Sequence, residues 1–216
     1  MVGAIQASAP PSIAGLYALT PDRSDTDSMT DFVGAALEGG AATIQYRNKT
    51  AAPELRLRQA RALHDLCAAH GAIFIINDDI DLASAIDADG VHLGRGDAAI
   101  ALARARLRAT ALIGASCYDS LELAEAAVAA GADYIVFGSF FPSNTKPDAV
   151  RAGLSLLTTA KARWSVPVVA IGGITPDNAE LLIEAGADAV AVISALFDAA
   201  DVAAAARSFV ALFNKR

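Results

Sequence analysis

Short apolar runs alternate about eight times along this chain with longer stretches rich in Ala, Leu, Glu and Arg. The short runs have the β-branched and apolar content of buried strands, and the longer stretches have the composition of helices. Strand and helix in regular alternation are typical of βα units, whose strands lie parallel in one sheet. The predicted strands are residues 15–19, 42–47, 72–76, 90–93, 111–115, 134–138, 166–171 and 189–194.

A weak internal repeat supports this interpretation. The segments EGGAATIQYR, IDADGVHLG, AAGADYIVFG and EAGADAVAVIS each place small residues, usually with an Asp, just before an even-numbered strand. Divided among eight units, the 216 residues give about 27 per unit, close to the norm of a (β/α)8 barrel with short loops. We therefore predict a single (β/α)8 TIM barrel, of class α/β, over residues 14–216, preceded by a flexible or extended segment 1–13. The alternative is an open doubly wound sheet, but its usual GxGxxG turn is missing from ALTPDRSD after the first strand.

Composition narrows the class of protein. The formal charge of −7 argues against nucleic-acid binding, and no run reaches the roughly 18 consecutive apolar residues of a membrane span. Cys67 and Cys117 show no CxxC spacing, so we expect free buried thiols in a reducing compartment. We expect a soluble, cytoplasmic protein with small-molecule partners and no nucleic-acid or membrane partner; association into a homo-oligomer stays open.

The carboxyl ends of barrel strands carry the chemistry in this fold class, and polar residues collect there. After the second strand, alternation with period two places Gln45, Arg47 and Lys49 on one face, opposite the apolar Ile44. An amide and two cations suit an anionic substrate. The alternative is a solvated loop whose cations serve solubility.

Two carboxylates follow the third and fourth strands. Asp78 and Asp97 suit Mg²⁺, which prefers one or two carboxylates together with phosphate oxygens and water. The alternative for each is a helix N-cap, and we interpret Asp79 and Asp81 as helix-start residues rather than ligands. His92 lies inside a strand, and we interpret it as a hydrogen-bonded residue of the barrel interior.

Three further loops complete the predicted rim. The loop 138–146 is rich in hydroxyl groups and contains two adjacent Phe residues, which favours a lid over a polar substrate. Its Lys146 has a Schiff-base lysine as an alternative role. The glycine turn at Gly172 and Gly173, with the loop at Ser194, occupies the place after strands seven and eight where many such barrels bind phosphate. Two anion pockets on one rim imply two phosphorylated substrates, or one doubly phosphorylated substrate.

Eight segments in this order and spacing resemble the thiamine-phosphate synthase (thiamine-phosphate pyrophosphorylase) family over nearly the whole chain after residue 14. They are LYALTPD, the Q-x-R-x-K of 45–49, IINDDIDLA, DGVHLGRGD, the G-x-S of 114–116, ADYIVFGSFFPSNTK, VVAIGGI and AVISALF.

The resemblance implies a transferase of thiamine biosynthesis. In such a reaction 4-amino-2-methyl-5-hydroxymethylpyrimidine diphosphate loses pyrophosphate, and the nitrogen of 4-methyl-5-(2-hydroxyethyl)thiazole phosphate takes its place to give thiamine phosphate. The implied mechanism is a Mg²⁺-assisted dissociative displacement, in which fixed cations stabilise the departing pyrophosphate.

The resemblance also assigns roles to single residues. Asp78 and Asp97 would bind Mg²⁺, and Arg47, Lys49, Asn77 and Lys146 would hold the diphosphate. Gln45 and Ser116 would contact the pyrimidine or its diphosphate, with Ser116 among the candidate catalytic residues. The thiazole phosphate would rest on Gly173, Ile193 and Ser194, under a loop that carries Ser143 and Thr145.

The chain departs from the family pattern at four positions. Tyr46 replaces the usual Leu, Ser139 and Ser143 stand where the lid usually has Pro and Thr, and Asp79 replaces a basic or small residue. The rival functions are a thiazole tautomerase-like relative, a non-catalytic phosphate-binding or regulatory paralogue, and a Schiff-base aldolase.

Overall fold

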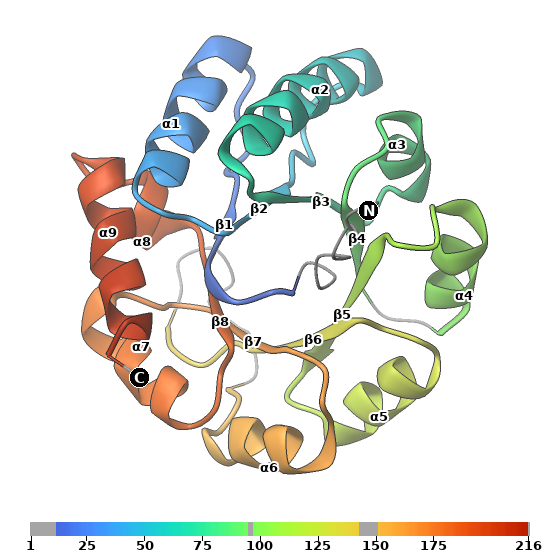
Figure 1. The fold of residues 1–216 in the computed structure, drawn as a ribbon, viewed down its shortest axis with the longest axis vertical. Coiled ribbons are helices and arrows are strands. Elements are labelled where there is room, and N and C mark those ends of the chain that lie inside the picture. Colours follow the sequence, from blue (N-terminus) through green and yellow to red (C-terminus); the bar gives the residue numbers. More distant parts are fainter. Residues whose placement is uncertain (1–11, 95–96, 143–150, 216) are drawn as a thin grey trace, which may run out of the picture.

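Eight parallel strands close into a barrel in which each strand pairs with its neighbours in chain order and β8 pairs with β1. The computed structural model describes residues 12–94, 97–142 and 151–215. Figure 1 looks along the barrel, with the helices arranged as a ring outside the strands. The strands are β1 (Gly15–Leu19), β2 (Thr43–Tyr46), β3 (Ile73–Asn77), β4 (Gly90–Leu93), β5 (Leu112–Tyr118), β6 (Tyr134–Phe137), β7 (Val168–Ile171) and β8 (Ala189–Val192). The predicted (β/α)8 barrel is therefore confirmed, and the main difference is that β5 continues to Tyr118.

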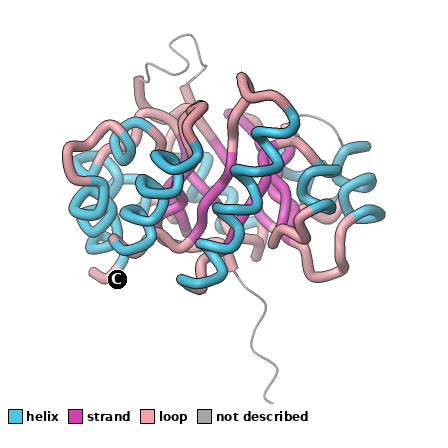
Figure 2. The backbone as a smooth tube through the Cα atoms, turned by 90° about the horizontal axis from the view of Figure 1, so that it is seen from above, coloured by secondary structure: helices cyan, strands magenta, loops and turns pink. Residues whose placement is uncertain are grey.

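The helices lie on the outer face of the strands, as the side view in Figure 2 shows. Side-chain caps begin several of them: Asp25, Asp79, Ser120 and Asp201 each accept a hydrogen bond from a backbone N–H of the first turn. The expected helix-start role of Asp79 is thus confirmed. The helices are α1 (Thr26–Glu38), α2 (Pro53–His70), α3 (Ile80–Ala85), α4 (Asp97–Arg106), α5 (Leu121–Ala129), α6 (Ser155–Arg163), α7 (Pro176–Glu184), α8 (Ser194–Phe197) and α9 (Val202–Phe213).

The alternation of side chains along each strand divides the core into two layers. A larger layer packs between the sheet and the helices, and it includes Ile44, Tyr46 and the two free cysteines, Cys67 and Cys117. Burial raises the pKa of both thiols to about 12, so both stay protonated. A smaller layer fills the barrel itself and contains Tyr17, Ile75, Tyr134, Val169 and their neighbours.

Three aspartates give the internal repeat its physical meaning. Each precedes an even-numbered strand, and its carboxylate accepts a hydrogen bond from a backbone N–H at the start of the preceding strand. Each also pairs with a basic side chain, so it joins two strands and a helical unit at the amino-terminal end of the barrel. The hydrogen-bonded pairs are Asp89 with Phe74 (2.9 Å), Asp133 with Ile113 (2.7 Å) and Asp188 with Val168 (2.8 Å).

The start of the described chain contributes to the barrel interior, because Ile13 is buried against the inner layer. Residues 1–11 lie outside the described part, so the boundary at residue 13 stays a prediction. Within the described ranges, no helix is long and apolar enough to cross a membrane.

Candidate active site

A cavity of about 710 Å³ opens at the carboxyl ends of the strands, and we call it the inner pocket. Strands and loops from around the barrel contribute to its wall, as expected where parallel strands end on one rim. Seven residues that the sequence analysis assigned to substrates line it: Gln45, Arg47, Asn77, Ser116, Gly173, Ile193 and Ser194.

The floor of the inner pocket carries an ordered polar chain. Gln45 donates from Nε2 to the hydroxyl of Tyr17 at 2.7 Å, and the hydroxyl oxygens of Tyr17 and Tyr134 lie 3.0 Å apart. With its amide nitrogen engaged in this way, the buried Oε1 of Gln45 has no protein partner within the described chain. A buried acceptor without a partner costs free energy, so this oxygen is suited to receive an N–H of a bound ligand.

His92 lies beside this floor and combines two roles. Its Nε2 lies 2.8 Å from the Oγ of Ser116, and its ring stacks on Tyr134, which confirms a hydrogen-bonded residue of the interior. It also lines the inner pocket, and its buried Nδ1 has no partner among the described residues. Burial lowers the pKa of His92 to about 4, so the ring is neutral near neutral pH.

The two cations after β2 differ in the pockets that they line. Arg47 continues the alternation of the strand and lines the inner pocket, where its guanidinium lies 3.4 Å from Asp22. Lys49 lies in the following loop, because β2 ends at Tyr46 and the Lys49 N–H donates to Asp22 instead of to a strand. Of the three residues predicted to share one face, Gln45 and Arg47 line the inner pocket, whereas Lys49 shares only a second pocket with Arg47.

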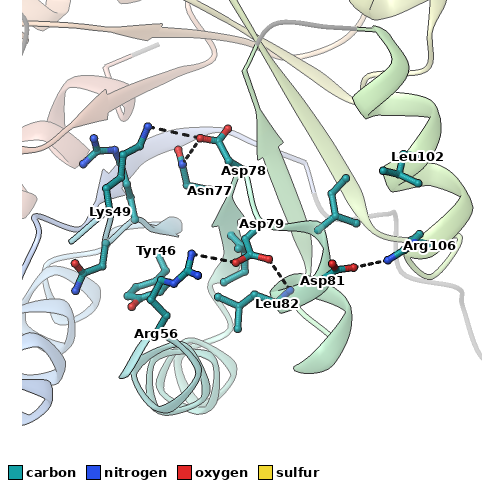
Figure 3. A pocket seen from close by; sticks show the side chains of 14 residues that line it. Tyr46, Lys49, Arg56, Asn77, Asp78, Asp79, Asp81, Leu82, Leu102 and Arg106 are labelled. Atoms are coloured by element: carbon teal, nitrogen blue, oxygen red, sulfur yellow. Dashed lines mark hydrogen bonds and ion pairs between the residues drawn. The ribbon is translucent and has the colours of Figure 1, made fainter. Parts of the chain in front are cut away.

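Lys49 instead lines an outer pocket of about 610 Å³, between the β2–α2 loop and the start of α3 (Figure 3). Arg56, Asp78 and Asp79 also line this outer pocket. Arg47 and Asn77 line both pockets, so they form the boundary between them.

Asp78 is held at this boundary in an unusual backbone conformation. Its φ is 59°, in the left-handed region that few residues other than glycine adopt, and such strain clusters at functional sites. Its N–H donates to the carbonyl of His92, and its Oδ1 accepts from the N–H of Gly94. Its Oδ2 accepts from Asn77 and lies 3.8 Å from the Nζ of Lys49. The carboxylate is thus aimed at the rim and remains half exposed to solvent.

The glycine turn after β7 is shaped by protein contacts. A Cβ on Gly173, whose φ is +65°, would lie 2.2 Å from the carbonyl oxygen of Pro142. Asn178 stabilises the turn: it donates to the carbonyl of Gly173 and accepts from the N–H of Thr175. A larger residue at 173 would therefore displace the β6–α6 loop before it met any ligand.

That loop differs from the expected lid in one respect. Phe140 is buried in the layer between sheet and helices, Phe141 packs against the same layer, and neither residue lines the inner pocket. Ser143, Thr145 and Lys146 lie outside the described residues, as does the side chain of Asp97, whose backbone begins α4.

Among the polar residues that line the inner pocket, the sequence analysis gave no site role to Tyr17, His92, Tyr118, Asp119 and Thr175. Tyr17 was detectable, because the alternation along 15–19 places it on the same face as Gly15 and Leu19. Tyr118 and Asp119 were not, because β5 was predicted to end at residue 115.

Known proteins resemble this chain both in sequence and in fold. A family model described as "Thiamine monophosphate synthase" matches residues 16–196. A thiamine-phosphate synthase of Chromobacterium violaceum is 57% identical over 96% of this chain and 100% of its own length. One of Methylobacillus flagellatus is 56% identical over 94% of this chain and 97% of its own length. Among solved structures, a thiamine phosphate pyrophosphorylase of Pyrococcus furiosus superposes with a TM-score of 0.83 at 38% identity, covering 94% of this chain and 96% of that one.

Proposed function

The chain belongs to the thiamine monophosphate synthase family, and from that premise we propose how its two pockets place the two substrates. The enzyme is a transferase that condenses the aminopyrimidine diphosphate with the thiazole phosphate to give thiamine phosphate and pyrophosphate. One observation carries the proposal: Arg47 and Asn77 line both pockets, so a diphosphate bound on them reaches from the inner pocket to the outer pocket.

The aminopyrimidine ring binds on the floor of the inner pocket. The free Oε1 of Gln45 accepts from an N–H of the exocyclic amine, and Ser116 and His92 supply further polar contacts. When pyrophosphate leaves, the pyrimidine methylene becomes electron-poor and the ring shares its positive charge. A neutral His92 suits this site, because an imidazolium would repel that charge.

The diphosphate lies on Arg47, Asn77 and Lys49; Lys146, which lies outside the described residues, would also hold it, as the family resemblance implies. Asp22 pairs with the guanidinium of Arg47 and accepts a hydrogen bond from the backbone N–H of Lys49, so it positions the Arg47 side chain and the backbone of Lys49 before substrate arrives. Fixed charges of this kind stabilise the leaving group without reorganisation during the reaction.

The residues present fit a magnesium ion. Asp78 offers a half-exposed carboxylate in the outer pocket, next in the chain to Asn77 of the proposed diphosphate site. Mg²⁺ is bound by one or two carboxylates with phosphate oxygens and water, so Asp78 and Asp97 would hold it together with the diphosphate. When bound, the ion supplies positive charge to the oxygens of the departing pyrophosphate.

The thiazole phosphate binds across the pocket from the pyrimidine, on the turn at Gly173 and on Ile193 and Ser194. Ser143 and Thr145, which lie outside the described residues, would contact it, as the family resemblance implies. Backbone N–H groups of a glycine turn suit a phosphate. Attack by the ring nitrogen uses its lone pair and releases no proton, so the step needs no general base.

Steady-state kinetics with each substrate varied in turn tests this placement. Arg47→Ala should raise the KM for the pyrimidine diphosphate and lower kcat, whereas Ser194→Ala should raise mainly the KM for the thiazole phosphate. A charge-assisted contact contributes roughly 1.5 to 3 kcal/mol, so the Arg47 variant should lose at least about tenfold in kcat/KM. Equal shifts of the same constant in both variants would show that the two placements are wrong. A cytoplasmic location and homo-oligomeric association stay predictions.

A further inference from the structure

Gln59 is a fully buried polar side chain on α2 that lines neither pocket. Among the described residues with buried polar side chains, it alone lies on a helix; the others lie on strands or in loops at the rim. A buried amide is retained at little cost only where its hydrogen bonds are made. Its partners therefore show what the residue does.

The hydrogen-bond partners of Gln59 lie at or just after the carboxyl ends of β1 and β2, and the loop after β2 carries the two proposed diphosphate cations. Its Oε1 accepts from the hydroxyl of Tyr46 at 2.9 Å and from the Nδ2 of Asn48 at 3.0 Å. Its Nε2 donates to the carbonyl of Arg23 at 3.0 Å. Asn48 closes the network, because its Nδ2 also donates to the Arg23 carbonyl at 2.6 Å.

Two of these partners flank Arg47 in the chain. Tyr46 directly precedes Arg47, and Asn48 lies between Arg47 and Lys49. Gln59 therefore bonds to the residues on both sides of Arg47, and it ties that loop to the β1–α1 loop through Arg23. Tyr46 and Asn48 are themselves almost completely buried, so water does not compete for these bonds.

The protonation states support a stable network. Burial raises the pKa of Tyr46 to about 12, so its hydroxyl remains a donor to Gln59 across the working pH range. Networks in which each buried member is satisfied make the segments they join rigid.

We propose that Gln59 is a positioning residue for the leaving diphosphate, because from α2 it holds Tyr46 and Asn48 and thereby sets the spacing of Arg47 and Lys49. The inference rests on the assignment of those two cations to the diphosphate. Catalysis by fixed charges depends on their geometry, and small displacements weaken it strongly. A leucine at position 59 would fill much the same space while leaving the loop without its partner.

The test compares Gln59→Leu with Leu63→Val, a change at another fully buried position of α2 that makes no polar contact with the loop. Binding of inorganic pyrophosphate in the presence of Mg²⁺ is measured by calorimetry, and KM and kcat are measured with each substrate varied. We expect Gln59→Leu to weaken pyrophosphate binding and raise the KM for the pyrimidine diphosphate by about tenfold. The KM for the thiazole phosphate should stay within about twofold, and Leu63→Val should leave all of these constants near wild type.

Two further variants keep the outcome decisive. Tyr46→Phe removes one bond of the network with little change of shape, and it should shift the same constants in the same direction by a smaller factor; it decides the question if Gln59→Leu does not fold. Equal effects of Gln59→Leu and Leu63→Val on all constants, or no effect of Tyr46→Phe, would overturn the inference.

Arg47→Ala, measured in parallel, distinguishes a failure of the diphosphate assignment from a failure of the proposed role of Gln59. If it leaves pyrophosphate binding unchanged, the diphosphate assignment itself fails and the role of Gln59 fails with it; if it weakens binding while the network variants do not, only the role of Gln59 fails.

Discussion

The Nζ of Lys49 lies 3.8 Å from the Oδ2 of Asp78, so the proposed diphosphate cation and the proposed magnesium ligand form an ion pair in the wall of the outer pocket (Figure 3). Both side chains are more than half exposed, so water screens their attraction and the pair separates at little cost. Arrival of the metal with its diphosphate would give each group a new partner of opposite charge.

The Lys49–Asp78 pair predicts that one substitution changes the binding of two ligands in opposite directions. Lys49→Met should weaken binding of magnesium pyrophosphate by about tenfold, because one cation is lost from the site. It should not weaken, and should slightly strengthen, binding of Mg²⁺ alone, because Asp78 loses a competing cation. Calorimetric titration with each ligand measures both effects, with Lys161→Met at the amino-terminal end of the barrel as the control for charge. Equal weakening of both ligands would contradict competition at Asp78.

Asp78→Asn tests the metal assignment with little change of shape. The amide keeps an oxygen for the N–H of Gly94 but loses the negative charge, so we expect kcat at limiting Mg²⁺ to fall by about 100-fold. Asp97→Asn should act in the same direction. Asp81→Asn, on α3 beside the same pocket, should change activity little, since Asp81 pairs with Arg106 on the protein surface. Wild-type activity of the Asp78 variant at trace Mg²⁺ would leave this carboxylate a purely structural role.

His92 predicts a dependence of stability on pH. Burial lowers its pKa from 6.5 to about 4, so between these values the unfolded chain binds a proton that the folded protein does not. The free energy of unfolding should therefore fall as the pH falls through this window, by about 2 kcal/mol between about pH 7 and about pH 5. Denaturant unfolding at several pH values measures the slope. His92→Gln should flatten it and the exposed His70→Gln should not; an unchanged slope in the His92 variant would contradict the prediction.

Asp188 predicts a loss of stability without a loss of activity. Its carboxylate accepts from the N–H of Val168 and pairs with Lys161, far from the carboxyl ends of the strands where substrates bind. Asp188→Ala leaves a partly buried N–H without its partner, so the free energy of unfolding should fall by about 1 to 3 kcal/mol. Lys161→Met, which removes only a surface ion pair, should cost less than about 1 kcal/mol. Thermal unfolding and steady-state kinetics together check this, and an altered KM in the folded Asp188 variant would count against it.

Much of the fold follows from features that lie close together in the chain. Each strand is marked by its own apolar run and each helix by its own composition, so the eight units could be counted without tertiary information. The rim residues Gln45, Arg47 and Asn77 could be placed for the same reason, because they continue strands whose direction the fold class sets. The side chains of Asp97, Ser143, Thr145 and Lys146 have roles that stay predictions.

The expectations that differ from the structure depended on local sequence patterns that contacts with distant residues override. Alternation placed Lys49 on the face of Gln45, but the Lys49 N–H donates to Asp22, 27 residues earlier, and Lys49 lines the outer pocket and not the inner one. The adjacent Phe pair was interpreted as part of a lid, but Phe140 is buried in the core; residues 143–150 of the same loop lie outside the described part, so their predicted role is not tested.

The sequence by itself therefore determined the type and order of the elements and which strand ends carry charge, since these depend on neighbours a few residues apart. Only the tertiary structure decided the partners of the buried polar groups. Tyr17 meets Tyr134 across 117 residues, and Gln59 reaches Arg23 across 36. A buried hydrogen-bonding group must find a partner wherever the closed barrel brings one, and no local preference encodes which distant segment that is.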